Sequence, residues 1–207
     1  MNLIYLLQVI KTIKRRVDFL FWKNKVLIAF YLLMFIFGPP VLLGFSQELD
    51  KVQIDYDSLF EKGLKRNGKL LNLSGKKIGN EGVKRLIASG ILEKVEKIDL
   101  RYNEITAKGA ELLAKIAPLP KLRVLILRHN IIGDAGSLAL AASNSFPNLE
   151  EMQLGWTETR DAGAQAFGNS DKFQKLKKLD LRGNFLASKT KEELRKSLGH
   201  LKSLRLF

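Results

Sequence analysis

The chain has 207 residues, of which 46% are hydrophobic and none is cysteine. The missing cysteines exclude a disulfide-stapled secreted module and a thiolate metal site, and the only histidines, His129 and His200, speak against a histidine metal site. The net charge of +14 divides into +5 from residues 1–25, zero from residues 26–45 and +9 from residues 46–207. A basic head, an uncharged stretch and a body of mixed charge are typical of a membrane-anchored domain.

Residues 1–25 have the pattern of a basic amphipathic helix. Apolar side chains such as Leu3, Leu6 and Ile10 recur at three- and four-residue steps, opposite a polar stripe that includes Lys11 and Lys14. Such a helix is suited to lie at an anionic membrane surface. Two alternatives remain open: a helix packed against another membrane subunit, and an import signal, which is also basic and poor in acidic residues.

Residues 26–45 contain no charged side chain and span ~30 Å as a helix, about the thickness of a bilayer core. The pattern predicts a transmembrane anchor, with a kink or an early end near Phe37 because Pro39 and Pro40 follow. Six basic residues precede the span and three follow within twenty residues, which favours the N-terminus on the matrix or cytoplasmic side. The basic front helix favours the mitochondrial inner membrane for this single-pass protein, with a bacterial inner membrane as the alternative.

Residues 46–69 are interpreted as a linker and N-terminal cap, and residues 70–207 as a repeat domain. Within the cap, residues 56–67 are predicted to form a short helix that shields the first repeat, with Ser58 and Glu61 in a capping-box relation. The repeat is shown by leucines spaced 27 residues apart, each preceded by an apolar residue two places earlier. These leucines are Leu73, Leu100, Leu127, Leu154 and Leu181.

The segments VEKIDLRYNEITAKGAELLA from Val95 and LRVLILRHNIIGDAGSLALA from Leu122 resemble the leucine-rich repeat consensus. Their long helical second half resembles the ribonuclease-inhibitor-like subfamily. The consensus asparagine is kept at Asn103, Asn130 and Asn184, whereas Lys76 and Thr157 replace it in the other copies, where the turns should be looser or differently bonded. The resemblance implies an α/β solenoid of about five repeats, with a curved parallel sheet and outer helices.

The residues themselves support the same architecture, because each L-x-L segment predicts a short strand and the stretch after it a helix. Glycines early in each helix are expected to permit a close approach of helix to strand. The final strand, around Leu204–Leu206, is expected to be an open edge of the sheet. The helix N-caps are predicted at Asn80, Thr106, Asp134, Asp161 and Ser188.

The open, concave face of the sheet is predicted to bind a partner. Its side chains alternate with the buried leucines, and the position after each strand adds an aromatic row that interface hot spots favour. The alternative is that the Asp–Arg pairs merely neutralise one another on a solvated face. The candidate partner-binding residues are Asp99, Arg101, Tyr102, Ile126, Arg128, His129, Gln153, Trp156, Asp180 and Arg182.

No catalytic, nucleotide-binding or nucleic-acid-binding motif is present in the sequence, which favours a non-catalytic protein without a cofactor. We expect an accessory or assembly subunit of a larger membrane complex, with lipid and membrane subunits contacting residues 1–45. Its excess of positive charge favours an acidic protein partner on the concave face. The alternative is a bacterial surface or secreted-effector repeat protein that recognises a host or signalling partner, and a regulator of a small GTPase is a third hypothesis.

Overall fold

The computed structural model describes residues 54–207. The predicted amphipathic helix of residues 1–25, the predicted anchor of residues 26–45 and the first part of the linker lie outside the described residues. Among the helices of residues 54–207, none has the length and apolar character needed to cross a membrane.

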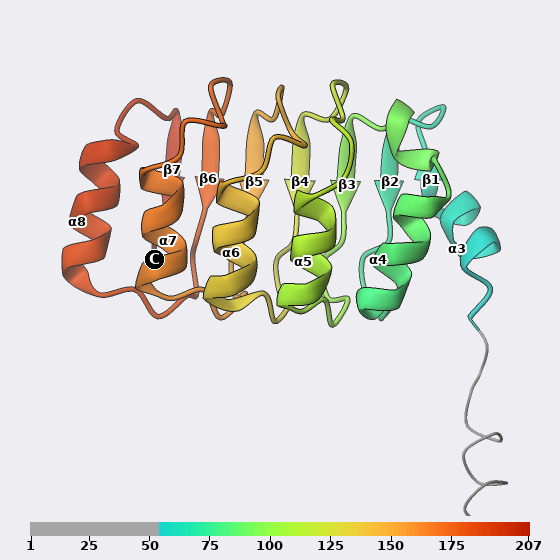
Figure 1. Ribbon diagram of the computed structural model, residues 1–207, viewed down its shortest axis with the longest axis horizontal. Coiled ribbons are helices and arrows are strands. Elements are labelled where there is room, and N and C mark those ends of the chain that lie inside the picture. Colours follow the sequence, from blue (N-terminus) through green and yellow to red (C-terminus); the bar gives the residue numbers. More distant parts are fainter. Residues whose placement is uncertain (1–53) are drawn as a thin grey trace, which may run out of the picture. The chain divides into compact units, whose positions relative to one another are not determined.

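Seven strands form one sheet in which each strand lies beside the next in chain order (Figure 1). β1 (Leu64–Lys65) runs antiparallel to β2 (Leu70–Asn72). The following strands are all parallel, as the repeat predicted. They are β3 (Lys97–Asp99), β4 (Val124–Ile126), β5 (Glu151–Gln153), β6 (Lys178–Asp180) and β7 (Ser203–Arg205).

The strand register follows the period of the sequence. Ile98 pairs with Leu125, and Leu125 pairs in turn with Met152, so equivalent residues of successive repeats are neighbours. The last step is shorter, because Leu179 pairs with Leu204. The 27-residue spacing therefore places equivalent side chains in ladders across the sheet, about 4.8 Å apart.

One helix per repeat covers the same side of the sheet, as Figure 1 shows. Between helices and strands lies a continuous apolar core that includes Leu73, Leu100 and Leu127, all fully buried. This arrangement confirms an α/β repeat fold with a parallel sheet and outer helices. The helices are α4 (Gly79–Ala88), α5 (Ala107–Ala114), α6 (Gly133–Ala141), α7 (Asp161–Gly168) and α8 (Ser188–Ser197), with a 3-10 turn, η1 (Ile91–Lys94), before β3.

The glycine early in each helix serves a different contact from the one predicted. A Cβ atom on Gly136 would lie 2.9 Å from the Cβ atom of Ala110 and 3.1 Å from the Cα atom of Ala107, both on the neighbouring helix α5. Gly163 of α7 lies equally close to Ser137 of α6. These glycines therefore permit a close approach of helix to helix rather than of helix to strand.

The predicted N-caps are correct only at Thr106, which precedes α5. Asn80 and Asp134 lie inside the first turns of α4 and α6, while Asp161 and Ser188 are the first residues of α7 and α8. The residues at the N-cap positions of those four helices are Ile78, Ile132, Arg160 and Ala187.

The side chains predicted as caps bond to the next repeat instead. Asp134 Oδ1 accepts hydrogen bonds from the backbone N–H groups of Arg160 at 2.8 Å and Gly163 at 2.9 Å. Asn80 Oδ1 accepts in the same way from the Thr106 N–H at 3.0 Å. Since stacking sets each helix N-terminus beside the previous one, a local sequence rule for caps misses this bond between repeats.

At the front of the sheet, α3 (Tyr56–Gly63) packs against β2 and buries Phe60 in the core. Its N-cap is Asp55, which accepts a hydrogen bond from the Ser58 N–H at 3.1 Å. The predicted capping box is thus wrong, because Ser58 supplies a backbone donor to the cap and is not the cap itself.

Candidate functional site

The turns after β2, β3 and β5 are each held by a buried asparagine of the following repeat. Asn130, 3% exposed, accepts hydrogen bonds at Oδ1 from the backbone N–H groups of Asn103 at 3.1 Å and Ile105 at 3.0 Å. Its Nδ2 group donates to the carbonyls of Leu100 at 2.9 Å and Leu127 at 2.7 Å. Asn103 and Asn184 make equivalent bonds. We call Asn103, Asn130 and Asn184 the asparagine ladder.

The fourth copy, where Thr157 replaces the asparagine, is bonded differently, as predicted. The Thr157 hydroxyl donates to the Leu154 carbonyl at 2.7 Å and lies 2.9 Å from the Thr159 hydroxyl. The Thr159 hydroxyl lies 2.7 Å from that of Ser137. Thus three buried hydroxyl groups replace one amide at this turn.

The residues directly before Asn103, Asn130 and Thr157 point toward solvent, away from the core. Tyr102, His129 and Trp156 form a continuous stack, which we call the aromatic row. The ring centroids of Tyr102 and His129 are 4.2 Å apart, and those of His129 and Trp156 are 4.9 Å apart, with interplanar angles of 8° and 10°. Tyr102 is 52% exposed and Trp156 41% exposed, so the stack presents a broad aromatic surface.

The aromatic row occupies backbone positions that favour glycine. The φ angles of Tyr102, His129 and Trp156 are 55°, 56° and 54°, in the left-handed region that bulky residues rarely adopt. The equivalent residues of the flanking repeats are Gly75 and Gly183, with φ angles of 70° and 69°. Strained backbone of this kind clusters at functional sites. Three aromatic residues in succession at such positions therefore point to a binding surface.

Two Asp–Arg pairs on the open face of the sheet, the face away from the helices, are satisfied within single strands. The Arg101 Nε and Nη2 groups donate to the two carboxylate oxygens of Asp99 at 2.9 and 2.7 Å. Arg182 binds Asp180 in the same way, at 3.0 and 2.7 Å. Burial opposes the ionisation of Asp180, but the hydrogen bonds donated by Arg182 outweigh it and lower the pKa of this carboxyl.

Arg128, between these pairs, lacks the equivalent aspartate. The residue two places before it is Ile126, which is 4% exposed. The Arg128 guanidinium carbon lies 4.8 Å from the centre of the Trp156 ring, and its Nε group is buried without a hydrogen-bond partner among residues 54–207. The side chain reaches this position over Gly155, where a Cβ atom would lie 3.5 Å from Nε. Arg128 is therefore held against the aromatic row by stacking alone.

The remaining predicted residues lie in the same surface. Gln153 of β5 pairs in register with Ile126 on one side and Asp180 on the other, and its amide donates to Glu151. The pKa of His129 is lowered, mainly because the ring is partly buried and further because Arg128 and Arg101 carry positive charge nearby. His129 is therefore neutral at pH 7, which suits a ring stacked between two others. All ten candidate residues lie on β3 to β6 or in the turns that follow these four strands.

Two exposed apolar side chains near the aromatic row were not predicted. Ile131 is 51% exposed and Phe185 81% exposed, and each lies two residues after the row position of its own repeat. Their separation of two repeat lengths is the signal that could have revealed them. They extend the apolar surface at the strand ends.

A ladder of alternating charge, also not predicted, lies where the strands begin. Lys69 pairs with Glu96 at 3.0 Å, and Lys177 pairs with Glu150 at 2.6 Å, each across neighbouring repeats. Arg123 occupies the equivalent position between the two acids. The alternation of sign at 27-residue spacing was visible in the sequence. The four lysine and glutamate side chains are thus paired across neighbouring repeats, whereas Arg128 at the strand ends has no such partner among residues 54–207.

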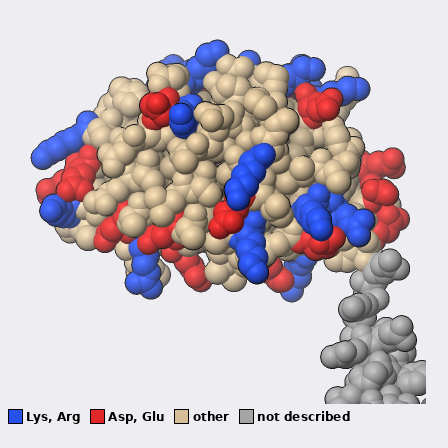
Figure 2. All heavy atoms as spheres, viewed as in Figure 1, with Lys and Arg blue, Asp and Glu red and all other residues tan. Residues whose placement is uncertain are grey.

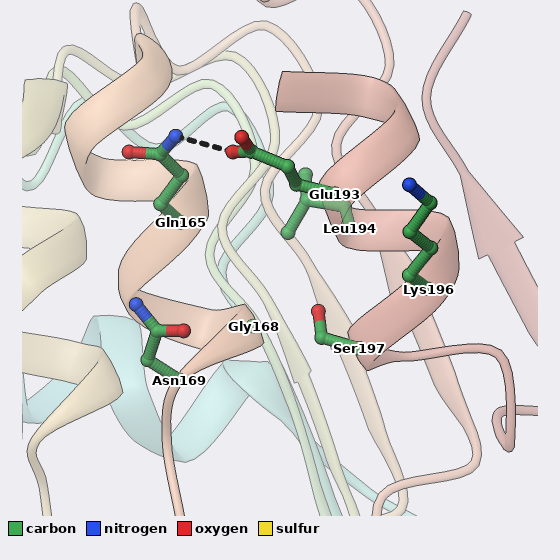
Figure 3. Close-up of a pocket in the computed structure, with 7 residues that line it drawn as sticks. All are labelled: Gln165, Gly168, Asn169, Glu193, Leu194, Lys196 and Ser197. Carbon is green, nitrogen blue, oxygen red and sulfur yellow. Dashed lines mark hydrogen bonds between the residues drawn. The ribbon is translucent and has the colours of Figure 1, made fainter. Parts of the chain in front are cut away.

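The helical side has a more ordinary surface. Figure 2 shows basic and acidic side chains scattered among neutral ones over this side. A groove of about 620 Å³ lies between α7 and α8 and is lined by polar side chains and Leu194 (Figure 3). The Gln165 amide crosses it and donates to Glu193 at 2.8 Å. In the described part of the chain, the helical side therefore has no counterpart of the open face, where an aromatic stack lies beside an unpaired arginine.

A comparison with protein families supports the repeat. A family model for the leucine-rich repeat matches residues 92–114 and 119–141, which contain β3 with α5 and β4 with α6. No curated protein matches the chain. The match and the parallel repeat fold agree on leucine-rich repeats, which are typical of protein-interaction scaffolds.

Proposed function

We propose that this chain is a protein-interaction scaffold that binds its partner with the open face of the sheet and the aromatic row. The stack of Tyr102, His129 and Trp156 is the observation that carries the proposal. Rings held in strained backbone and left exposed have no role in the core, whereas aromatic and arginine side chains dominate binding energy at interfaces. Ile131 and Phe185 add exposed apolar area beside them.

The proposal extends to the setting of the scaffold. The twenty uncharged residues 26–45 and the basic residues before them support a single-pass anchor with the N-terminus on the matrix or cytoplasmic side. A short repeat domain on such an anchor suits a non-catalytic accessory or assembly subunit of a membrane complex. Its ribonuclease-inhibitor-like repeats and a place in the mitochondrial inner membrane belong to the same proposal.

The binding surface is tested by site-specific photo-crosslinking in the cells that make the protein. A benzophenone amino acid replaces Tyr102, which is 52% exposed in the aromatic row, or Leu138, which is 46% exposed on α6. The two sites match in exposure but lie on opposite sides of the sheet. Adducts of a defined protein from position 102 and not from position 138 are expected. Adducts from position 138 alone would place the interface on the helices.

The membrane setting has its own test. Alkaline carbonate extraction of membranes should leave the intact chain in the pellet, and deletion of residues 26–45 should release it. Native electrophoresis in mild detergent should then show the intact chain in a complex of defined size. Recovery of the intact chain in the soluble fraction as a monomer would contradict the anchor and the subunit role together.

A further inference from the structure

The open face of the sheet carries three arginines at equivalent positions of the repeats that contain β3, β4 and β6. They are Arg101, Arg128 and Arg182. The outer two bind both oxygens of the aspartate two residues earlier. At that position the β4 repeat has Ile126. Within residues 54–207, no carboxylate lies within ion-pair distance of Arg128, and its Nε group is buried without a partner.

The buried Nε group of Arg128, without an acceptor among residues 54–207, destabilises the free protein. A buried N–H group without an acceptor destabilises a structure by roughly 1–3 kcal/mol. The neighbouring carboxylates do not relieve it, because Asp99 and Asp180 are already held by their own arginines at 2.7 Å. Residues 54–207 therefore supply no acceptor for this group.

The surroundings of Arg128 are suited to receive a carboxylate. Ile126 forms an apolar floor beside it, and the indole of Trp156 lies against the guanidinium at 4.8 Å. Apolar side chains beside a charge strengthen an ion pair, and arginine binds carboxylates through two parallel hydrogen bonds. The missing side chain at Gly155 leaves the space that the Arg128 side chain occupies.

We propose that Arg128 receives an aspartate or glutamate side chain of the partner, presented beside an apolar or aromatic residue that packs on the aromatic row. The inference rests on the proposed function, and it names the chemistry that the partner must present. The partner carboxylate completes for Arg128 what Asp99 and Asp180 supply to the arginines on either side. Charge complementarity at the centre of an apolar surface then sets specificity.

The test uses the full chain in detergent and a phage-displayed library of short random-sequence peptides as the probe. Peptides selected by the wild-type protein are expected to share one acidic position next to an apolar or aromatic one. For a selected peptide, Arg128→Gln should weaken binding by about tenfold or more. Replacing the acidic residue of the peptide by its amide should weaken binding to the wild type equally, and to Arg128→Gln hardly at all.

Two further variants serve as controls. Arg205→Gln removes the same charge from β7 on the same face and should leave peptide binding within about twofold, since one rim charge contributes little. Ile126→Asp keeps Arg128 but provides an internal carboxylate in the arrangement seen in the β3 and β6 repeats. It should fold, because buried aspartates occupy the equivalent positions, and it should lose the preference for an acidic peptide. This variant keeps the test decisive even where Arg128→Gln fails to fold.

The outcomes separate the two proposals. Peptides that require Trp156 but share no acidic position would overturn the role of Arg128 and leave the binding surface standing. An acidic preference that survives in both Arg128→Gln and Ile126→Asp would also overturn it. Both the carboxylate site and the interaction surface are wrong if no peptide is enriched. They are also wrong if enriched peptides bind to Trp156→Gly and to Arg128→Gln as well as they bind to the wild type.

Discussion

The asparagine ladder and the aromatic row differ by a single residue along the chain, yet they face opposite ways. Asn130 is 3% exposed and satisfies four backbone groups of two repeats. Its neighbour His129 joins Tyr102 and Trp156 in a stack open to solvent. The left-handed φ of 56° at His129 is what turns the chain between the two directions.

The difference separates the requirements of the fold from those of binding. The turn needs a buried polar side chain, an amide in three copies and hydroxyl groups at Thr157, because its backbone N–H and carbonyl groups are shielded from water. The position before it needs only a residue that tolerates a positive φ, and glycine is the relaxed choice. Aromatic residues at that position strain the fold, so their presence reflects what the surface does.

The largest expected effect comes from breaking the asparagine ladder at its centre. Asn130→Ala removes the hydrogen bonds of this side chain and leaves the buried N–H groups of Asn103 and Ile105 without an acceptor. We expect the free energy of unfolding to fall by about 3 kcal/mol or more. Guanidinium denaturation followed by circular dichroism measures it. Asn144→Ala, at an exposed asparagine, is the matched control and should change it by less than about 0.5 kcal/mol. Equal losses in the two variants would contradict the structural role of the ladder.

A smaller effect is expected where the aromatic row meets glycine. Gly183 and Gly75 have φ angles of 69° and 70°, but a Cβ atom on Gly183 would collide with the indole of Trp156, whereas space at Gly75 is open. Gly75→Ala should cost about 1–2 kcal/mol from its backbone alone. Gly183→Ala should cost more and should displace the ring.

Tryptophan fluorescence checks the displacement. The chain has two tryptophans, so the measurement is made with Trp22→Phe in the background, which leaves Trp156 alone. The emission maximum should shift in Gly183→Ala and stay unchanged in Gly75→Ala. An unchanged spectrum in both variants would show that Trp156 does not lie over Gly183 in solution.

The repeat fold could be predicted from the sequence because it depends on period alone. Leucines 27 residues apart give the parallel register, and alternation along each strand places Ile126 and Arg128 on the face opposite Leu125 and Leu127. Neither inference needs knowledge of loop conformation. Period and alternation therefore predict the fold and the ten candidate residues, but not the exposed side chains of Ile131 and Phe185.

The details of the surface depend on contacts between repeats, which no local pattern encodes. Asp134 is read from the sequence as a cap of its own helix, but stacking places its carboxylate at the N-terminus of the next one. The sequence predicts that Arg128 lies on the open face, but not that its side chain passes over Gly155 and stacks on Trp156. Ring stacking likewise follows from the left-handed turns, which are visible only in the structure.

Acidification should lower the free energy of unfolding through His129, by less than the Gly183→Ala substitution lowers it. The pKa of His129 is lowered in the folded protein by partial burial and by Arg128 and Arg101. A lowered folded pKa means that the unfolded chain binds the proton more tightly, so this contribution to stability is complete above the usual value of about 6.5. It is lost as the pH falls through the lowered pKa. Denaturation midpoints at neutral and mildly acidic pH should therefore differ, and His129→Asn should reduce the difference. An unchanged pH dependence in His129→Asn would exclude this residue as the cause.

The smallest effect on stability, and the sharpest contrast with Asn130→Ala, is expected at the end of the row. Tyr102→Gly removes one stacked ring, worth about 0.5–1.5 kcal/mol, but it also relieves a left-handed residue that costs about 1–2 kcal/mol. The two terms nearly cancel, so the free energy of unfolding should change by less than about 1 kcal/mol in either direction. The same substitution should abolish much of the peptide binding assigned to the row, because the exposed ring is lost. A residue whose removal leaves the fold intact and disables binding is what a surface selected for recognition requires. A large loss of stability in Tyr102→Gly would instead assign the stack to the fold.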